Sequence, residues 1–411
     1  MTATSTWQET WWSRPDLRYT DGTLRLAGHR LGEIAHAAGM PTFCYSAERV
    51  RTKLELLRAA LGRTGRPGRV FYAMKANRFV PLLSFLRTTG LCGIDACSPR
   101  ELQLALACGF AAADVSYTAT SVSNADLDVL VRHPDCIVNC DSLSSLRRLG
   151  ERSPGRSIGL RINPGKGVGY GDSELLTYSG AKTTKFGIYR EHLDEALRVA
   201  AQFDLAVHNL HFHVGIGYQT RQLPLWEEIL GICATFAEQI PDLRRINLGG
   251  GLGVPHRAGD DGLDLDAWAA VIARQFGSRD VEIAVEPGDF LVKDAGVLVL
   301  QANTVEKKRD TLFVGVDGGF NLAVEPAFYG MPCEPTPCEL RSGPAQVVTI
   351  AGNINEALDI WHRDVSLPPI HEGDYIAFLN AGGYASAMSS DHCMRGQFYE
   401  RLLFPSGADV R

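Results

Sequence analysis

Six sites along the chain carry residues that can do chemistry, and each lies at or just after the end of a short apolar run typical of a β-strand. They are Lys75, Asp95, Arg161, His213, the glycines Gly249, Gly250 and Gly251, and Glu286. A lysine amine can bond to a carbonyl group, and glycines let backbone N–H groups approach an anion. Taken alone, Lys75 is equally well a solvated charge at a strand end, and three glycines in a row can form a flexible turn. Chemistry follows only if the fold brings these residues together.

The apolar runs form a series that alternates with helical patterns. The eight runs are VFYAM (70–74), CGIDA (92–96), DVSYT (114–118), CIVNC (136–140), IGLRI (158–162), VHNLHFHV (207–214), RINLGG (245–250) and EIAVEP (282–287). The first five begin 22 residues apart. Eight strands alternating with helices predict an α/β fold, the (β/α)8 TIM barrel, whose active site lies at the carboxyl ends of the strands. A doubly wound open sheet is the alternative, but its GxGxxG motif after an early strand is missing.

Three segments are expected along the chain. Residues 1–38 form an N-terminal segment with a hairpin, LRYTDGTLRL (17–26), which turns at Asp21 and Gly22. Residues 39–292 form the barrel. From Val297 onward the alternation gives way to strands and turns, so residues 293–411 are expected to form an all-β domain. The N-terminal hairpin is expected to join that domain.

The composition limits the kinds of partner. With 45% hydrophobic and 21% charged residues, the chain has the composition of a typical globular protein. Its net charge is −6, and its basic residues form no stripe of the kind that binds nucleic acid or an anionic membrane. No run reaches the length of about eighteen apolar residues that indicates a membrane span. The N-terminus also lacks a signal-peptide pattern. A small molecule is therefore the expected partner.

Metal and redox sites are not indicated. The ten cysteines show neither CxxC nor zinc-site spacing, so reduced thiols and a cytoplasmic location are expected. His211 and His213 would face the same side of a strand, but no third ligand at suitable spacing accompanies them. We therefore assign no metal.

The six sites suit one cofactor if they share a barrel rim. A lysine, a carboxylate and a glycine loop after the seventh strand together suggest pyridoxal 5'-phosphate. Lys75 would bond to its aldehyde, the glycines would hold its phosphate, and Glu286 would pair with its pyridine nitrogen and keep that nitrogen protonated. Asp95 and Arg161 lie on the same rim and are assigned to the cofactor site.

Eight motifs in a fixed order also carry a family resemblance. They are YAMKAN (72–77), DACSPRELQLAL (95–106), HFHVG (211–215), LGGGLG (248–253), EPG (286–288), VDGGFN (316–321), EGDYIAFLNAGGYASAMSS (372–390) and MRG (394–396). In this order they resemble the fold-type III pyridoxal-phosphate decarboxylases, the group of diaminopimelate and ornithine decarboxylases. The resemblance implies an alanine-racemase-like barrel followed by a β-domain, in a homodimer with active sites at the subunit interface.

The resemblance also implies residue roles. Lys75 is the lysine that bonds to the cofactor, His213 stacks on the cofactor ring, and Glu286 contacts the pyridine nitrogen. Gly249 to Gly251 hold the phosphate. Tyr384, in NAGGYAS, matches the family tyrosine near the phosphate and is expected to reach the cofactor of the partner subunit.

Two departures from the family pattern concern the substrate. The family's EPGR is EPGD here, which places Asp289 where an arginine is usual, and RPALY is EPAFY, which places Glu325 where another arginine is usual. In diaminopimelate decarboxylases those arginines hold the distal carboxylate of the substrate. Two acids would repel that group, so the departures disfavour diaminopimelate and suit a basic distal group.

A third departure lies in GNINEALDIW (352–361). Asn355 takes the place of a family cysteine that helps to protonate the product, whereas Glu356 and Asp359 match the family. An amide cannot donate a proton in that way, so Lys75 or a water is the candidate donor. All three residues are assigned to the substrate site.

The predicted activity is decarboxylation of an amino acid or of an amino-acid-derived intermediate. An amino-acid racemase and a non-catalytic pyridoxal-phosphate carrier are the alternatives. The racemase would need acid and base groups on both faces of Cα, and the carrier resembles the barrel alone. The sequence specifies neither the chirality of the substrate nor whether it is free or bound to a carrier.

Overall fold

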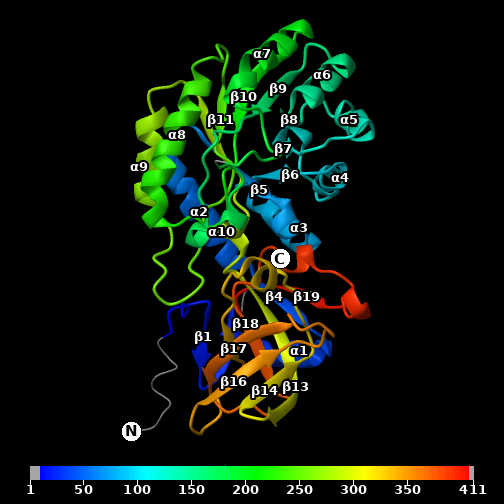
Figure 1. Ribbon diagram of the computed structural model, residues 1–411, viewed down its shortest axis with the longest axis vertical. Coiled ribbons are helices and arrows are strands. Elements are labelled where there is room, and N and C mark those ends of the chain that lie inside the picture. The colour runs from blue at the N-terminus through cyan, green and yellow to red at the C-terminus, as the bar shows by residue number, and fades with distance from the viewer. Residues whose placement is uncertain (1–9, 181, 407–411) are drawn as a thin grey trace. The chain divides into compact units, whose positions relative to one another are not determined.

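The computed structural model describes residues 10–180 and 182–406 (Figure 1). The chain divides into two compact units. One comprises residues 53–254 and 261–290, and the other residues 1–52, 255–260 and 291–411.

The first unit is a closed barrel of eight parallel strands. In chain order these are β5 (Gly68–Ala73), β6 (Gly93–Ala96), β7 (Val115–Thr118), β8 (Ile137–Cys140), β9 (Ser157–Arg161), β10 (Ala206–His211), β11 (Arg245–Asn247) and β12 (Glu282–Val285). The last strand pairs with the first, Val285 opposite Val70, which closes the barrel. The predicted TIM barrel is therefore confirmed, and the open sheet is wrong.

Helices follow the strands and cover the outside of the barrel (Figure 1). They are α2 (Ala47–Gly62), α3 (Val80–Thr89), α4 (Pro99–Ala107), α5 (Asn124–Leu130), α6 (Leu143–Arg152), α7 (Leu193–Gln202), α8 (Leu223–Ala237), α9 (Leu265–Phe276) and the short α10 (Asp289–Val292). Serine side chains start three of them, because Ser98, Ser123 and Ser142 each accept a hydrogen bond from the backbone N–H three residues later. These caps fix where the chain turns from strand to helix.

The second unit is built mainly from sheet. Its strands are β1 (Leu17–Thr20), β2 (Thr23–Leu26), β3 (His29–Arg30), β4 (Thr42–Ser46), β13 (Gly296–Lys308), β14 (Thr311–Val316), β15 (Pro335–Pro337), β16 (Gln346–Ala351), β17 (Ile360–Leu367), β18 (Tyr375–Phe378) and β19 (Tyr399–Leu403). The main sheet has the order β15-β18-β13-β14-β16-β17, and β4 pairs with both β13 and β19. Two helices, α1 (Leu31–Ala38) and α11 (Glu325–Tyr329), accompany the sheets.

The predicted hairpin is present as β1 and β2, with Leu17 opposite Leu26. Asp21 and Gly22 both have positive φ, as a two-residue hairpin turn requires. Its apolar side chains lie in one buried cluster with Val297 and Val299 of β13. Burial of this face therefore ties the N-terminal hairpin to the C-terminal sheet.

The limits of the two units differ from the predicted segments 1–38, 39–292 and 293–411. The main difference is β4, which was expected in the barrel segment and lies in the sheet unit. β4 follows residue 38, yet it forms backbone hydrogen bonds with β13, with Tyr45 opposite Gly296. All five residues of β4 are buried. Its apolar sequence is like that of a barrel strand, so composition alone does not show whether β4 belongs to the barrel or to the sheet unit.

Two of the strand ends also differ from the prediction. The sixth barrel strand ends at His211, so the alternation of side chains does not extend to His213. The seventh ends at Asn247, and the glycines lie in the loop that follows. Within the described residues, no helix is long and apolar enough to cross a membrane.

Candidate active site

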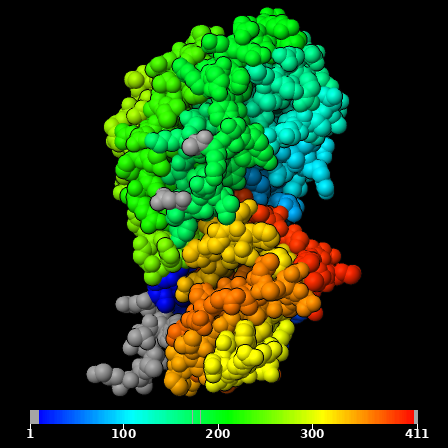
Figure 2. Space-filling model, in the orientation of Figure 1, coloured from blue at the N-terminus to red at the C-terminus, as the bar shows by residue number. Residues whose placement is uncertain are grey.

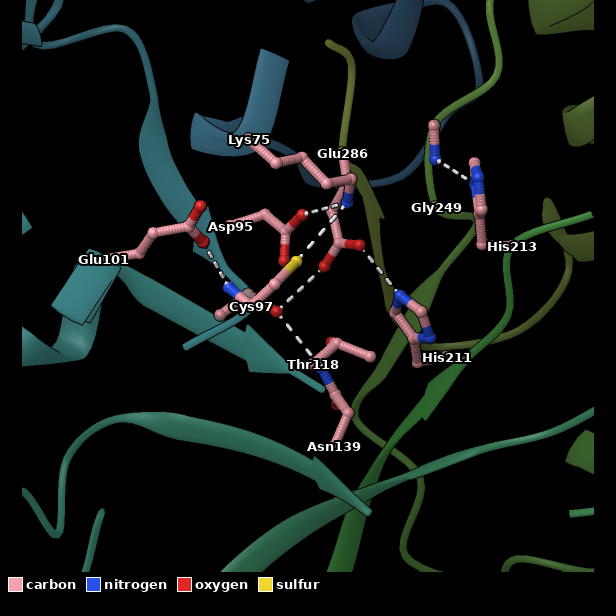
Figure 3. A network of polar contacts seen from close by, with 12 residues as sticks. Lys75, Asp95, Cys97, Glu101, Thr118, Asn139, His211, His213, Gly249 and Glu286 are labelled. Carbon is pink, nitrogen blue, oxygen red and sulfur yellow. Dashed lines mark hydrogen bonds and ion pairs between the residues drawn. The ribbon is translucent and has the colours of Figure 1, made fainter. Parts of the chain in front are cut away.

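The lysine lies where the sequence placed it, at the carboxyl end of the first barrel strand (Figure 3). A short 3-10 turn, Met74–Ala76, follows β5 and carries Lys75. Its Nζ atom is 3.1 Å from Oδ2 of Asp95 and 3.5 Å from Sγ of Cys97. The Lys75 side chain is 40% exposed, whereas that of Asp95 is 1% exposed. The amine is thus anchored by a buried acid but still accessible to a ligand.

Glu286 lies directly after β12 and is held by three donors from three other strands. Ser116 Oγ donates to Oε1 at 2.9 Å, and Asn247 Nδ2 donates to the same oxygen at 2.7 Å. His211 Nε2 lies 2.8 Å from Oε2. Asn139 Nδ2 donates to Ser116 Oγ at 3.1 Å, which orients that hydroxyl toward the carboxylate. The network fixes the position of a carboxylate that is 6% exposed.

The network also sets the charge of this carboxylate. Burial alone would raise the pKa of Glu286, but His211, Lys75 and Ser116 outweigh it and lower the pKa below its usual value. Burial lowers the pKa of His211, although Glu286 opposes this. The two directions agree with a neutral imidazole that donates its Nε2–H to an ionised carboxylate. A buried anion of this kind suits a protonated ring nitrogen of a ligand.

Asp95 behaves in the opposite way. Burial and the nearby Glu286 raise the pKa of Asp95 to about 7, although Lys75 opposes the rise. Two carboxyl groups on one rim therefore have pKa values shifted apart, which is common in active sites.

His213 follows β10 and presents a neutral ring. Its Nδ1 accepts a hydrogen bond from the backbone N–H of Gly250 at 3.2 Å, so its proton is on Nε2. The ring centroid of Tyr178 lies 4.8 Å away. Burial and the cations Lys75 and Arg161 lower the pKa of His213 well below its usual value. A neutral, fixed imidazole can pack against the face of a planar ring, as predicted for this residue.

The glycine loop packs closely against neighbouring strand ends. A Cβ atom on Gly249 would lie 2.3 Å from the carbonyl oxygen of Phe212, and one on Gly250 would lie 2.4 Å from that of Glu286. The backbone N–H of Gly249 donates to Asn247 Oδ1 at 3.0 Å. Close packing thus explains the glycines by itself, and two of their N–H groups already have side-chain acceptors, on Asn247 and His213. Phosphate binding by Gly249 to Gly251 stays a prediction.

Arg161 ends β9 on the same rim. Its guanidinium lies 4.7 Å from the ring centroid of Phe186. Burial lowers the pKa of Arg161, whereas Asp141 and Glu286 oppose that shift. The residue contributes positive charge near the buried carboxylates.

The remaining predicted residues lie on other segments of the chain. Asp289 is buried at the start of α10 in the barrel unit. The others are in the sheet unit: Glu325, Asn355, Glu356, Asp359 and Tyr384. Glu325 forms a buried ion pair with Lys293. Asp359 accepts the backbone N–H groups of Phe320 and Ile354, both at 2.7 Å, which explains its burial without a substrate.

Sequence reasoning missed the partners of Glu286. His211 was considered only as a metal ligand or core residue, and Ser116, Asn139 and Asn247 were not singled out. Each of the three is a polar residue inside a run that otherwise reads as a buried strand. Buried polar groups need partners, so this interruption was a usable signal. No group of three or more potential metal ligands occurs in residues 10–180 and 182–406.

The residues present fit pyridoxal 5'-phosphate. An accessible lysine amine can bond to its aldehyde, and the ionised Glu286 can accept a hydrogen bond from its pyridine nitrogen. The neutral His213 ring can cover one face of the cofactor.

Comparison with known proteins agrees with this chemistry. Residues 47–293 match the family described as "Pyridoxal-dependent decarboxylase, pyridoxal binding domain". The diaminopimelate decarboxylase of Methanothermobacter thermautotrophicus is 32% identical over 409 residues, covering 96% of this chain and 94% of that protein. The Streptomyces coelicolor diaminopimelate decarboxylase is 31% identical, covering 94% and 89%. The crystal structure of Helicobacter pylori diaminopimelate decarboxylase with L-lysine superimposes with a TM-score of 0.83 at 25% identity, covering 90% and 93%.

The shifted pKa of Asp95 predicts a pH effect on folding. An unfolded Asp has a pKa of about 3.9. Between that value and about 7 the folded protein keeps a proton that the unfolded chain has lost, so the stability falls as pH rises through this window. In Asp95→Asn this loss should be absent. Urea unfolding of the cofactor-free protein from pH 4 to 8 should therefore show the variant gaining stability relative to wild type.

Asp128→Asn is the control, because it also removes one negative charge but from a carboxylate that is 59% exposed. A stability difference between wild type and Asp95→Asn that stays constant with pH would contradict the assignment.

Proposed function

This chain belongs to the pyridoxal-dependent decarboxylases. From that premise we propose that Lys75 holds pyridoxal 5'-phosphate, that Glu286 pairs with its ring nitrogen and that His213 packs on its ring. The protein is a pyridoxal-phosphate-dependent amino-acid decarboxylase, a lyase. The racemase and carrier alternatives are set aside, because the matching family and the relatives are decarboxylases. The residue roles are our proposal.

One observation carries these roles: an ionised Glu286, held by three donors, lies on the same rim as an accessible lysine amine. When bound, the cofactor supplies a conjugated ring that takes up the electron pair of the broken Cα–carboxylate bond. Glu286 would accept a hydrogen bond from the protonated ring nitrogen, and His213 would pack on the ring. Lys75 would hold the cofactor through its aldehyde, and its amine is placed to carry a proton.

The phosphate contacts are proposed on the resemblance and on position. Gly249 to Gly251 follow the seventh strand, where barrels often bind phosphate. Tyr384 is assigned to the phosphate of the cofactor bound by the partner subunit. Arg161 and Asp95 complete the rim and adjust its charge.

Replacement of Lys75 tests the central role. Lys75→Ala should lower kcat by at least about 10²-fold, the lower end of what a positioned acid–base group contributes. It should also remove the absorbance band of lysine-bound cofactor. Lys307→Ala, at an exposed lysine in β13, should change neither measurement. Retention of the absorbance band in Lys75→Ala would refute the assignment.

The identity of the substrate is a separate proposal. The relatives compared above are named for diaminopimelate, which makes meso-diaminopimelate the reference compound. Asp289, where the resemblance expects an arginine, is a buried carboxylate that follows Glu286 by three residues. Where the resemblance expects a cation that holds a distal carboxylate, this chain has an acid, so we propose a substrate without a distal carboxylate and with a basic distal group.

Glu325 does not strengthen this proposal, although the sequence suggested it. Its carboxylate is bound by Lys293, and both side chains are buried. The pair carries no net charge, so Glu325 does not act there as an isolated anion. Among the other predicted substrate residues, Asn355 and Glu356 are exposed and stay candidates, whereas Asp359 holds backbone N–H groups.

A substrate panel tests the role of Asp289. Carbon dioxide release would be measured from meso-diaminopimelate, from lysine, ornithine and arginine in both chiral forms, and from acidic and acyl-linked amino acids. We expect a basic amino acid to be preferred over diaminopimelate by about tenfold or more in kcat/KM, a difference of about 1.4 kcal/mol. Asp289→Asn should narrow that preference and Asp289→Arg should narrow it further.

Preference of wild type for diaminopimelate, with no change in Asp289→Asn, would overturn the substrate proposal. So would turnover of an acidic or acyl-linked amino acid while every basic one fails. Neither result would affect the role of Lys75.

We also propose that the protein is a homodimer in the cytoplasm. The ten cysteines form no disulfide, which supports a reducing compartment. Several large apolar side chains of the sheet unit are exposed, among them Phe328 at 58%, Leu358 at 49% and Met394 at 86%. Phe320 lies 6.0 Å from the ring of Phe328 and 6.0 Å from that of His392, so these segments adjoin. The red segment near the C-terminal end projects from the surface (Figure 2).

The exposed residues Phe328, Leu358 and Met394 make a patch suited to a second copy of the chain. Met394→Asp combined with Phe328→Asp should lower the apparent mass from dimer to monomer in sedimentation at micromolar concentration. The control Val80→Asp introduces one such negative charge at an exposed apolar residue of the barrel, 50% exposed, and is compared with each of the two substitutions made singly. A dimer that survives the double substitution would place the interface elsewhere.

A further inference from the structure

The ion pair between Lys293 and Glu325 is buried within the sheet unit. The side chains are 3% and 8% exposed, respectively. Lys293 directly follows α10, and Glu325 is the first residue of α11. The residues are 32 positions apart in the sequence, so the contact joins two separate segments.

Stability alone is a poor explanation for such a pair. Taking two charges out of water is unfavourable, and well-packed apolar residues often replace a buried ion pair without loss of stability. A buried ion pair is therefore better explained by the conformation of the neighbouring segments that it fixes. The contacts of Lys293 indicate which conformation that is.

Lys293 makes three contacts with the loop that carries Tyr384. Its Nζ donates to the carbonyl oxygen of Gly383 at 3.2 Å and lies 5.8 Å from the ring centroid of Tyr384. Its own carbonyl oxygen accepts the backbone N–H of Gly382 at 3.0 Å. One residue thus contacts three successive members of the loop, through both its backbone and its side chain.

The loop needs such support because of its backbone. Tyr384 has a φ of 55°, in the left-handed region that is strained for a residue with a side chain. A Cβ on Gly382 would lie 1.8 Å from the carbonyl oxygen of Val292, so the loop packs tightly against the segment before Lys293. A strained conformation persists only when surrounding contacts determine it.

A small cavity connects the pair to the tyrosine. Its volume is about 10 Å³, and Lys293, Glu325, Tyr384, His256 and Cys333 are among the residues that line it. The charged pair and the tyrosine therefore face the same narrow space.

We propose that Lys293 and Glu325 are positioning residues that hold Tyr384 in place for the phosphate of the partner subunit's cofactor. Glu325 fixes the lysine ammonium, and the lysine fixes the Gly382–Tyr384 segment through Gly383. The inference rests on the proposed role of Tyr384. It also gives Glu325 a different role from the one predicted from the sequence. Glu325 would act on the Gly382–Tyr384 segment and not on the distal group of the substrate.

A double-mutant cycle tests this coupling. The variants are Lys293→Met, Tyr384→Phe and the two combined, each prepared as cofactor-free protein and titrated with pyridoxal 5'-phosphate to give a dissociation constant. We expect each single change to raise that constant about tenfold, and the double change to raise it no further, as for residues in contact. Lys308→Met is the control, because Lys308 lies near Glu306 in an exposed pair of the same unit.

Two further variants separate positioning from folding. Lys293→Arg keeps the charge if the methionine variant fails to fold, and it should weaken cofactor binding less than Lys293→Met does. Reversal of the pair, Lys293→Glu with Glu325→Lys, keeps opposite charges but loses the donor to Gly383. Its melting temperature should recover toward wild type while its cofactor affinity stays low.

Each outcome has a defined meaning. If Tyr384→Phe leaves the dissociation constant unchanged, the proposed role of Tyr384 is wrong. If Tyr384→Phe weakens binding but Lys293→Met lowers only the melting temperature, Tyr384 keeps its role and the positioning inference fails. Additive effects in the double variant would also overturn the inference.

Discussion

The structure of the candidate site depends on keeping one buried carboxylate ionised. Glu286 is 6% exposed, and burial by itself would favour its neutral form. Three hydrogen-bond donors offset that cost, and they come from β7, β10 and β11. A barrel can supply this arrangement because its strands point side chains from several directions into one space. The polar residues within otherwise apolar strands are therefore explained by the hydrogen bonds that they donate to Glu286.

The same constraint explains the division of charge on the rim. An ionised Glu286 makes a second nearby anion unfavourable, which contributes to the raised pKa of Asp95. Lys75 lies 3.1 Å from Asp95 and opposes that rise. Burial and two cations keep His213 neutral. The rim thus combines one firm anion, one acid poised near neutrality and a neutral ring, which is a suitable environment for a charged, planar ligand.

The barrel and the position of Lys75 on its rim could be predicted because they depend on local patterns. Apolar runs beginning 22 residues apart specify strands, and rim position follows from the fold. The assignment of β4 failed because a buried strand has the same composition in either unit. The partners of Glu286 were missed because they lie on strands far apart in the sequence. The ion pair between Glu325 and Lys293 was missed for the same reason, because no regular sequence spacing indicates that the two residues are in contact.

Closure of the barrel has a consequence for how the protein is made. Lys75 follows the first barrel strand and Glu286 the last, and these two strands pair only when the barrel closes, with the N–H of Ala73 bonded to the carbonyl oxygen of Pro287. During synthesis from the N-terminus, Lys75 emerges from the ribosome about 200 residues before Glu286, which at about 5–20 residues per second is a delay of roughly 10–40 seconds. A chain interrupted in that interval has Lys75 and its ion-pair partner Asp95 but lacks the buried anion Glu286. Assembly of the complete rim is therefore coupled to the longest-range strand pairing of the barrel, and premature release leaves the lysine–aspartate pair without the second carboxylate.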